Sequence, residues 1–279
     1  MKQWSAGQRW MAAAVLFFSL VHAAVKFLSH IPFFELVFFR ALISLVICAY
    51  LLRSKGISLI GHNRRLLFAR GLAGTCALTG YFYTLQAMPL ATAVTVQYLS
   101  PIITLLIAGV LLGEKARAQQ WLYFFTAFIG VLLVKGLDPR VSYLSLGVGI
   151  SAAFFSALAY NFVRMLKDTD HALVVVFYFP LTTIPLVGPF AISGWVWPVG
   201  WDWLVVLVIG VGTQIAQVYM TKAYQAEPAS RISLINYIGL IFALAIGWFG
   251  FSEAIPWLSV AGMALILTSV FLGTRGKAS

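Results

Sequence analysis

The polar side chains that could do chemistry in this chain lie inside long apolar runs, where they recur at helical spacing. Within one run, Ser19 precedes His22 by three residues, and Lys26 follows His22 by four. Gln214 and Gln217 show the same spacing in a later run. Residues three or four apart share one face of a helix. Because polar groups are costly in apolar surroundings, these faces are expected to line an interior site.

The candidate site is a cavity for a polar small molecule, lined by amides, phenols and one imidazole. For single serines and threonines in the same runs, hydrogen bonding between helices is the alternative. The histidine either binds substrate, carries a proton or is a satisfied interior side chain. The expected cavity residues are His22, Tyr83, Gln97, Tyr98, Tyr160, Asn161, Gln214, Gln217, Asn236 and Tyr237.

Three cations lie within or at the ends of these runs and are either gate residues or structural residues. Arg40 is the most deeply placed, and a structural pairing with Glu35 or with helix carbonyls is favoured. Lys26 and Arg164 either guide an anionic or zwitterionic substrate or extend to the lipid headgroups. Glu253 is placed at a helix start, where a carboxylate stabilises the helix dipole.

The chain carries none of the usual catalytic or metal-binding patterns. Its two cysteines, Cys48 and Cys76, have no metal-ligand spacing and are expected to be packing residues. No H-E-x-x-H or G-x-S-x-G motif occurs, and Glu35 is the one acid expected inside a run. An intramembrane enzyme and ATP-driven transport by this chain are therefore disfavoured, and no metal or cofactor is expected.

The composition predicts that the partner of this chain is a lipid bilayer. Its 279 residues are 61% apolar and only 10% charged, whereas soluble domains are about 25% charged. Apolar runs of about 20 residues, long enough to cross the hydrocarbon as helices, recur throughout, and no alternating β-barrel pattern is present. The net charge of +11 comes from scattered basic residues, so nucleic acid is not an expected partner.

The apolar runs predict an all-α integral membrane protein with ten transmembrane helices. The first run has no cleavage site of the signal-peptide type and is kept as a span. If both termini are cytoplasmic, most of the 19 basic residues fall on the inner side, as the positive-inside rule requires. The expected location is the bacterial inner membrane. The predicted spans are 10–29, 34–52, 66–87, 90–112, 117–136, 143–165, 172–192, 202–225, 228–250 and 255–273.

The chain contains an internal repeat. The stretches QAMPLATAVTVQYLS and QAEPASRISLINYIG align without a gap and are similar in sequence. Each belongs to a five-span unit, predicted as 1–137 and 138–279. Because five is odd, the second unit must enter the membrane in the opposite direction. This explains why Lys115 and Arg117 follow the first copy and have no basic counterparts after the second. Inverted repeats are typical of secondary transporters.

The chain contains the motifs YTLQAMPLA (83–91), YLSPI (98–102), LGEK (112–115), GVLL (130–133) and FFR (38–40). In these motifs it resembles the drug/metabolite transporter superfamily, specifically its EamA-type ten-helix members. The resemblance implies a cavity lined mainly by helices 1, 3, 4, 6, 8 and 9 and the movement of small polar metabolites. The second copy departs from the pattern at Leu240, where the first has Pro101, and at Ser252, where the first has Gly113.

We therefore expect a secondary transporter that moves an amino acid or amino-acid-like zwitterion by alternating access, with export favoured. The alternatives are an uptake carrier for S-adenosylmethionine or a similar metabolite and, in another class, a lipid scramblase or flippase. The substrate, the direction, coupling to protons and the oligomeric state are left open by the sequence.

Overall fold

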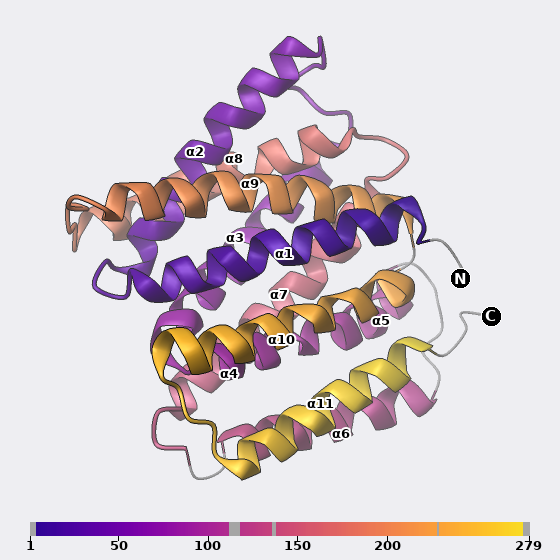
Figure 1. Cartoon of the computed structure of the whole chain (residues 1–279). Coiled ribbons are helices and arrows are strands. Elements are labelled where there is room, and N and C mark those ends of the chain that lie inside the picture. The colour runs from indigo at the N-terminus through magenta and orange to yellow at the C-terminus, as the bar shows by residue number, and fades with distance from the viewer. Residues whose placement is uncertain (1–3, 112–117, 136–137, 228, 276–279) are drawn as a thin grey trace.

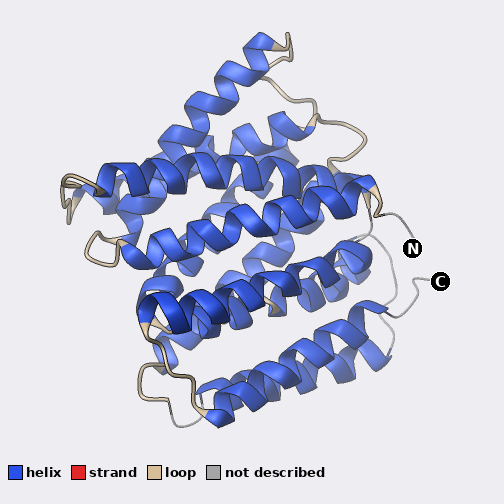
Figure 2. Cartoon of the chain, in the orientation of Figure 1, coloured by secondary structure: helices blue, strands red, loops and turns tan. Residues whose placement is uncertain are grey.

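The computed structural model describes residues 4–111, 118–135, 138–227 and 229–275, and every element within these ranges is a helix (Figure 2). No strand occurs in these ranges. The helices are α1 (Ala6–Phe27), α2 (Phe33–Ser54), α3 (Arg64–Ala87), α4 (Leu90–Gln97), α5 (Leu99–Leu111), α6 (Ala118–Lys135), α7 (Tyr143–Met165), α8 (Ala172–Ile192), α9 (Asp202–Ala226), α10 (Ala229–Phe251) and α11 (Trp257–Arg275).

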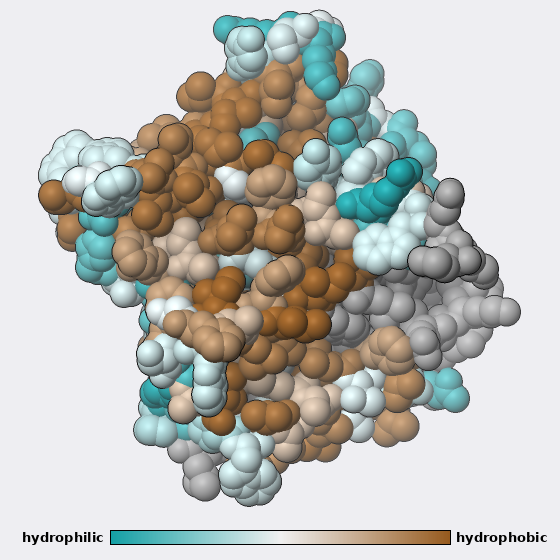
Figure 3. Space-filling view, in the orientation of Figure 1, coloured by the Kyte–Doolittle hydropathy of each residue, from teal (hydrophilic) through white to brown (hydrophobic). Residues whose placement is uncertain are grey.

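Most of these helices are suited to a bilayer. Among the described residues, six spans are long and apolar enough to cross a membrane: α1, α2, α4 together with α5, α7, α8 and α9. Shorter apolar helices cover Trp121–Leu133, Ile238–Phe251 and Trp257–Ser269. The remaining helix, α3, is less apolar because it carries basic, threonine, tyrosine and glycine residues. The visible surface is apolar across its middle and hydrophilic near the helix ends (Figure 3).

The predicted span 90–112 is interrupted in the structure at Tyr98, which separates α4 from α5. The backbone N–H of Tyr98 bonds to the carbonyls of both Val94 and Thr95, so the chain tightens there. Three residues later, Pro101 has no N–H to donate to the carbonyl of Gln97. This local break lies in the middle of the bundle, where a discontinuous helix can present backbone and side-chain polar groups.

The helices of the first half pack against those of the second half. The most extensive contacts join α3 to α7, α1 to α9, α6 to α11 and α2 to α8, and Figure 1 shows α1 beside α9 and α6 beside α11. Gly71 permits the close approach of α3 to α8, because a Cβ there would lie 2.9 Å from the carbonyl oxygen of Tyr178. The two halves thus share their interior.

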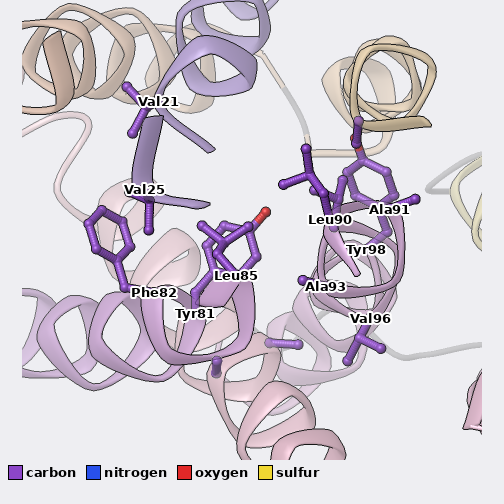
Figure 4. Packing of buried hydrophobic residues seen from close by; sticks show 14 of the residues in the cluster. Val21, Val25, Tyr81, Phe82, Leu85, Leu90, Ala91, Ala93, Val96 and Tyr98 are labelled. Atoms are coloured by element: carbon purple, nitrogen blue, oxygen red, sulfur yellow. The ribbon is translucent and has the colours of Figure 1, made fainter. Parts of the chain in front are cut away.

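The largest apolar cluster draws residues from both halves of the chain and includes the region where α1, α3 and α4 meet. Phe82 of α3 points toward Val21 and Val25 of α1, and Leu85 continues the same face (Figure 4). Burial of such side chains contributes about 2 kcal/mol each in water. Within a bilayer, van der Waals packing and hydrogen bonds between helices have the larger share. The cluster holds the inner wall of the bundle in place.

We call the side at which α1 begins the N-side and the opposite side the far side. On the N-side, α1 begins where α9 ends, since a Cβ at Gly7 would meet the Glu227 side chain. The same side is tied by Asp170, whose carboxylate accepts hydrogen bonds from the backbone N–H groups of His62 and Asn63. Gln225 donates to the carbonyl of Asp170. The start of α3, the α7–α8 connection and the end of α9 are therefore linked.

Candidate substrate cavity

A cavity of about 150 Å³ lies inside the bundle and is lined by both halves of the chain. Its walls come from α1, α2, α3 and the α4–α5 break in the first half of the chain, and from α7, α8, α9 and α10 in the second half. On α1 the lining runs from Met11 to His22, and on α9 it runs from Thr213 to Tyr224. The lining is centred along α1 and α3, and on α9 it lies towards the N-side end.

Aromatic and amide side chains form much of the polar wall. The Tyr81 hydroxyl lies 3.4 Å from Nδ1 of His22, and their rings meet edge to face. Gln97 donates through Nε2 to the Ser156 hydroxyl at 2.7 Å, while its Oε1 is buried without a partner. Such an acceptor next to a cavity is positioned to receive a hydrogen bond from a bound molecule.

The Tyr160 and Tyr224 rings stack at a centroid distance of 4.6 Å and join α7 to α9. A Cβ at Gly239 of α10 would lie 2.7 Å from the Tyr98 hydroxyl, so the glycine leaves room for that phenol. These tyrosines combine apolar faces with polar hydroxyls. They suit the recognition of an organic molecule that carries polar groups.

Two arginines give the cavity its charge. The guanidinium carbons of Arg40 and Arg70 lie 4.8 Å and 4.7 Å from the centroid of the same ring, that of Phe179. Both side chains line the cavity and both residues are 2% exposed. Gly74 leaves space for this arrangement, because a Cβ there would lie 3.0 Å from Nη1 of Arg70 and from the Phe179 ring.

A charged contact joins three segments of the chain on the far side of the bundle. Lys26 Nζ lies 2.7 Å from Glu253 Oε1 and donates to the carbonyl of Met88 at 2.7 Å. The second oxygen, Glu253 Oε2, accepts from the backbone N–H of Leu90 at 2.7 Å. One pair thus ties the end of α1 and the start of α4 to the α10–α11 connection, and we call it the far-side latch.

A second contact holds the same connection. Arg140 donates through Nη2 to the carbonyl of Ala254 and pairs with the Asp138 carboxylate at 2.8 Å. Hydrogen bonding to Asp138 raises the pKa of the Arg140 guanidinium above its ordinary value. The α10–α11 connection is therefore anchored from both α1 and the α6–α7 connection.

The structure brings several of the expected cavity residues together. The lining residues among them are His22, Gln97, Tyr98, Tyr160 and Gln217. Arg40 also lines the cavity; of the two structural pairings expected for it, the one with Glu35 is not formed, since Glu35 Oε2 accepts from the backbone N–H of Val196. The side chains of Asn236 and Tyr237 lie outside the described residues.

Three expected residues lie away from the cavity. Tyr83 packs edge to face against Phe33. Asn161 is fully buried and donates to the carbonyls of Thr104 and Ala157, joining α7 to α5. Each is on a helix that does contribute to the cavity, but on another face. Helical spacing groups residues by face without saying which face is inward.

Gln214 is the third, and it connects α9 to α2. It accepts a hydrogen bond from the Ser44 hydroxyl and donates to Cys48 Sγ at 2.8 Å. Of the two cysteines expected to be packing residues, Cys48 is buried in this contact, whereas Cys76 is exposed on α3. The pair Gln214 and Gln217 is therefore divided between helix packing and cavity lining.

The remaining two charged candidates differ in their surroundings. Lys26 belongs to the far-side latch and does not line the cavity. Arg164 is also absent from the lining, and it makes interactions near the N-side end of α7. Glu253, expected to stabilise its own helix start, instead caps α4 and pairs with Lys26.

Arg70, Tyr81 and Tyr224 also line the cavity, although they are not among the cavity residues expected from the sequence. From the sequence alone Arg70 looks like one more basic residue of the inner side, but it lies more than a full turn inside α3. Its spacing of four from Gly74 was the available signal, because a glycine there gives a long side chain room to lie along the helix. The tyrosines continue the faces of Ala77 and Gln217 at helical spacing.

Comparisons with known proteins identify the family of this chain. The model of the EamA-like transporter family matches the chain twice, over residues 5–136 and 144–275. The pseudopaline exporter CntI of Pseudomonas aeruginosa is 32% identical over 93% of each chain. An S-adenosylmethionine uptake transporter of Rickettsia prowazekii is 24% identical over 96% of this chain and 92% of its own.

A solved crystal structure of another protein superposes on this chain with a TM-score of 0.70, over 96% of both chains. Its sequence is 20% identical, so this likeness concerns the fold alone. Human solute carrier family 35 member G1 is 26% identical over 90% of this chain and 74% of its own. The relatives are transporters, and the chain is a multi-pass membrane protein of the same kind.

Proposed function

The chain belongs to the EamA-like transporter family of the drug/metabolite transporter superfamily, and on this premise we propose that it exports an amino-acid-like metabolite by alternating access. The observation that carries the proposal is the cavity, whose lining comes from both halves of the chain, together with the Lys26–Glu253 contact that bridges the far side. A site shared by two halves is what an alternating carrier requires, because relative movement of the halves can expose it to either side.

We propose that residues 1–137 and 138–279 are two inverted five-helix repeats and that the chain has ten spans with both ends in the cytoplasm. The helix contacts support this, since α1 packs on α9 as α7 packs on α3, and α2 packs on α9 as α8 packs on α3. If α1, α2 and α3 of the first half correspond to α7, α8 and α9 of the second, each contact has an equivalent in the other half. Exposed basic residues on the N-side, including Arg53, Lys55, Arg64 and Arg65, favour a cytoplasmic N-side in the bacterial inner membrane.

The proposed direction is export. With the N-side in the cytoplasm, the far-side latch holds the outer ends of α1, α4 and α10 together, an arrangement suited to loading from within. The similarity to the pseudopaline exporter supports the same direction. The second candidate is uptake of S-adenosylmethionine, favoured by the rickettsial relative. It is disfavoured by Arg40 and Arg70, since that metabolite carries a fixed positive charge.

The test is counterflow in proteoliposomes. Purified protein is reconstituted into vesicles loaded with one unlabelled amino acid, and uptake of the same labelled compound is followed with and without a pH gradient. We expect saturable exchange for at least one compound of the class. The Gln217→Ala variant should weaken it, because Gln217 lines the cavity. A response to the gradient would identify proton coupling, for which His22 is the candidate carrier.

Gln214→Ala is the matched control, because Gln214 lies on the same helix but contacts α2 instead of the cavity. Exchange should persist in this variant once the protein is folded. Labelled S-adenosylmethionine and a fluorescent phospholipid are run in parallel. Exchange of S-adenosylmethionine alone would favour the uptake carrier, and lipid movement without any metabolite exchange would favour a scramblase and contradict the proposal.

A further inference from the structure

The two arginines of the cavity lack the partners that buried cations normally have. No described carboxylate forms an ion pair with Arg40 or Arg70. The Nε atoms of both and Nη1 of Arg70 are buried without a hydrogen-bond acceptor. Buried charges are costly unless they are paired. Two such side chains facing one cavity therefore indicate that the acceptors come from a ligand.

The contact with Phe179 does not replace those acceptors. A cation over an aromatic ring gains less than the cost of removing it from water. The ring also satisfies none of the N–H groups, which lie in the guanidinium planes. Its position does explain the geometry, since both guanidinium carbons lie within 5 Å of the centroid of this one ring, at 4.8 Å and 4.7 Å. Both groups are within reach of a single small molecule.

We infer that Arg40 and Arg70 form a binding site for a substrate that carries two carboxylates. The described lining residues include these two cations and no aspartate or glutamate. A substrate with one carboxylate and one ammonium would leave the excess positive charge of the cavity uncompensated. Two carboxylates supply two negative charges and planar acceptors that match the guanidinium fork. The inference rests on the proposed transport function and narrows its substrate class.

The rest of the wall suits the remainder of such a molecule. The free Oε1 of Gln97 accepts from an amine, and the tyrosine faces cover an aliphatic segment. An amino acid with an acidic side chain therefore satisfies the groups that the cavity presents. A neutral amide of the same shape would leave the two cations with a single carboxylate to share.

The experiment compares two matched pairs of compounds: L-glutamate with L-glutamine, and L-aspartate with L-asparagine. Binding to the purified full-length protein in detergent is measured as the rise in melting temperature with ligand concentration. We expect each acid to bind at least about tenfold more tightly than its amide, because charge-assisted bonds to arginine are replaced by weaker ones. Equal binding of acid and amide, or binding of the amides alone, would overturn the inference.

Variants at the two arginines test the assignment. Arg70→Gln and Arg40→Gln should each reduce the preference for the acid by about tenfold or more. Without ligand, both variants should melt at the temperature of the parent or above it, because each loses an unpaired buried charge. The matched control is Arg65→Gln, an exposed arginine on α3, and it should bind both acids as the parent does.

A structural role for the arginines predicts the opposite pattern. Arg70→Gln would then melt at a lower temperature without ligand and retain the acid-to-amide ratio of the parent, which would contradict the inference. Failure of the inference is distinguishable from failure of the proposed function. Counterflow of a neutral amino acid with no binding of either acid would leave the transporter in place and remove the two-carboxylate site.

Discussion

Breaking the far-side latch should open the far side of the bundle. In Lys26→Met the aliphatic stem is retained, but the charge that contacts Glu253 and the Met88 carbonyl is lost. The side chains of Lys26 and Glu253 are 15% and 9% exposed. The energy of this pair should therefore lie between two limits. An exposed ion pair contributes about 0 to 1 kcal/mol, and the disruption of a buried one costs about 3 to 5 kcal/mol.

We take about 2 kcal/mol as the stabilisation that the latch gives to the closed far side. If the open arrangement lacks the contact, its loss raises the open-to-closed ratio by about 30-fold. A state present at about 1% would then reach about a quarter of the molecules. Such a change is large enough to be seen directly as a second population of distances.

Spin labels at two exposed far-side positions, Phe27 on α1 and Trp257 on α11, report the opening. The labels are attached to cysteines in a background with Cys48 and Cys76 replaced by alanine, and the distance distribution is measured by double electron–electron resonance. The parent should give one main distance, and Lys26→Met should add a longer one. Glu253→Gln should act in the same direction but less, since its amide oxygen still accepts from Leu90.

Lys167→Met is the matched control, because Lys167 pairs with Asp168 at 3.8 Å on the exposed N-side surface. It should leave the far-side distance unchanged. An unchanged distribution in Lys26→Met, or the same change in Lys167→Met, would refute the role assigned to the latch.

Three further predictions follow from other contacts. Gln214→Ala should lower the free energy of unfolding by about 1 to 3 kcal/mol through lost hydrogen bonds, while substrate affinity is retained. Gln217→Ala should instead lower substrate affinity and retain the free energy of unfolding. Melting measures the stability of both variants, and ligand titration measures their affinity. Ser252→Gly should raise the unfolding free energy by about 0.5 to 1 kcal/mol, because Ser252 has a φ of 51° that glycine adopts without strain; an unchanged melting temperature would count against this. Burial and the nearby lysines 55 and 222 lower the pKa of His171, whose Nδ1 caps α8 by accepting from Leu173. The folded pKa is below the unfolded 6.5, so this contribution is complete above about pH 6.5 and is lost as the pH falls through the lowered value. His171→Asn, which keeps a capping side chain, should show a smaller fall in melting temperature between about pH 7.5 and pH 5.5.

Most of the helices were predictable because they are apolar runs bounded by polar or proline residues. The expected limits 143–165 and 172–192 coincide with α7 and α8. The break at Tyr98 was not predicted, although Pro101 removes a helical donor at that point. Apolar periodicity continues through the break, so only the missing N–H marks it.

The site was less predictable because the sequence shows which polar residues share a helix face, but not what that face contacts. Gln214 and Gln217 are three residues apart, yet one binds α2 and the other lines the cavity. Arg70 resembled the exposed arginines before it, and only the placement of Phe179 from α8 shows its role. Glu253 was expected to act within its own helix, while its partners Lys26 and Leu90 are distant in the sequence. Contacts of this kind depend on how the helices pack.

The most direct test of the account is whether one cavity position can be reached from both sides of the membrane. Ser156→Cys places a thiol in the cavity wall, in the background with Cys48 and Cys76 replaced by alanine. A membrane-impermeant maleimide is added to oriented vesicles from either side. We predict labelling from each side, slowed by a saturating transported amino acid. Labelling from one side alone, with and without that compound, would contradict alternating access.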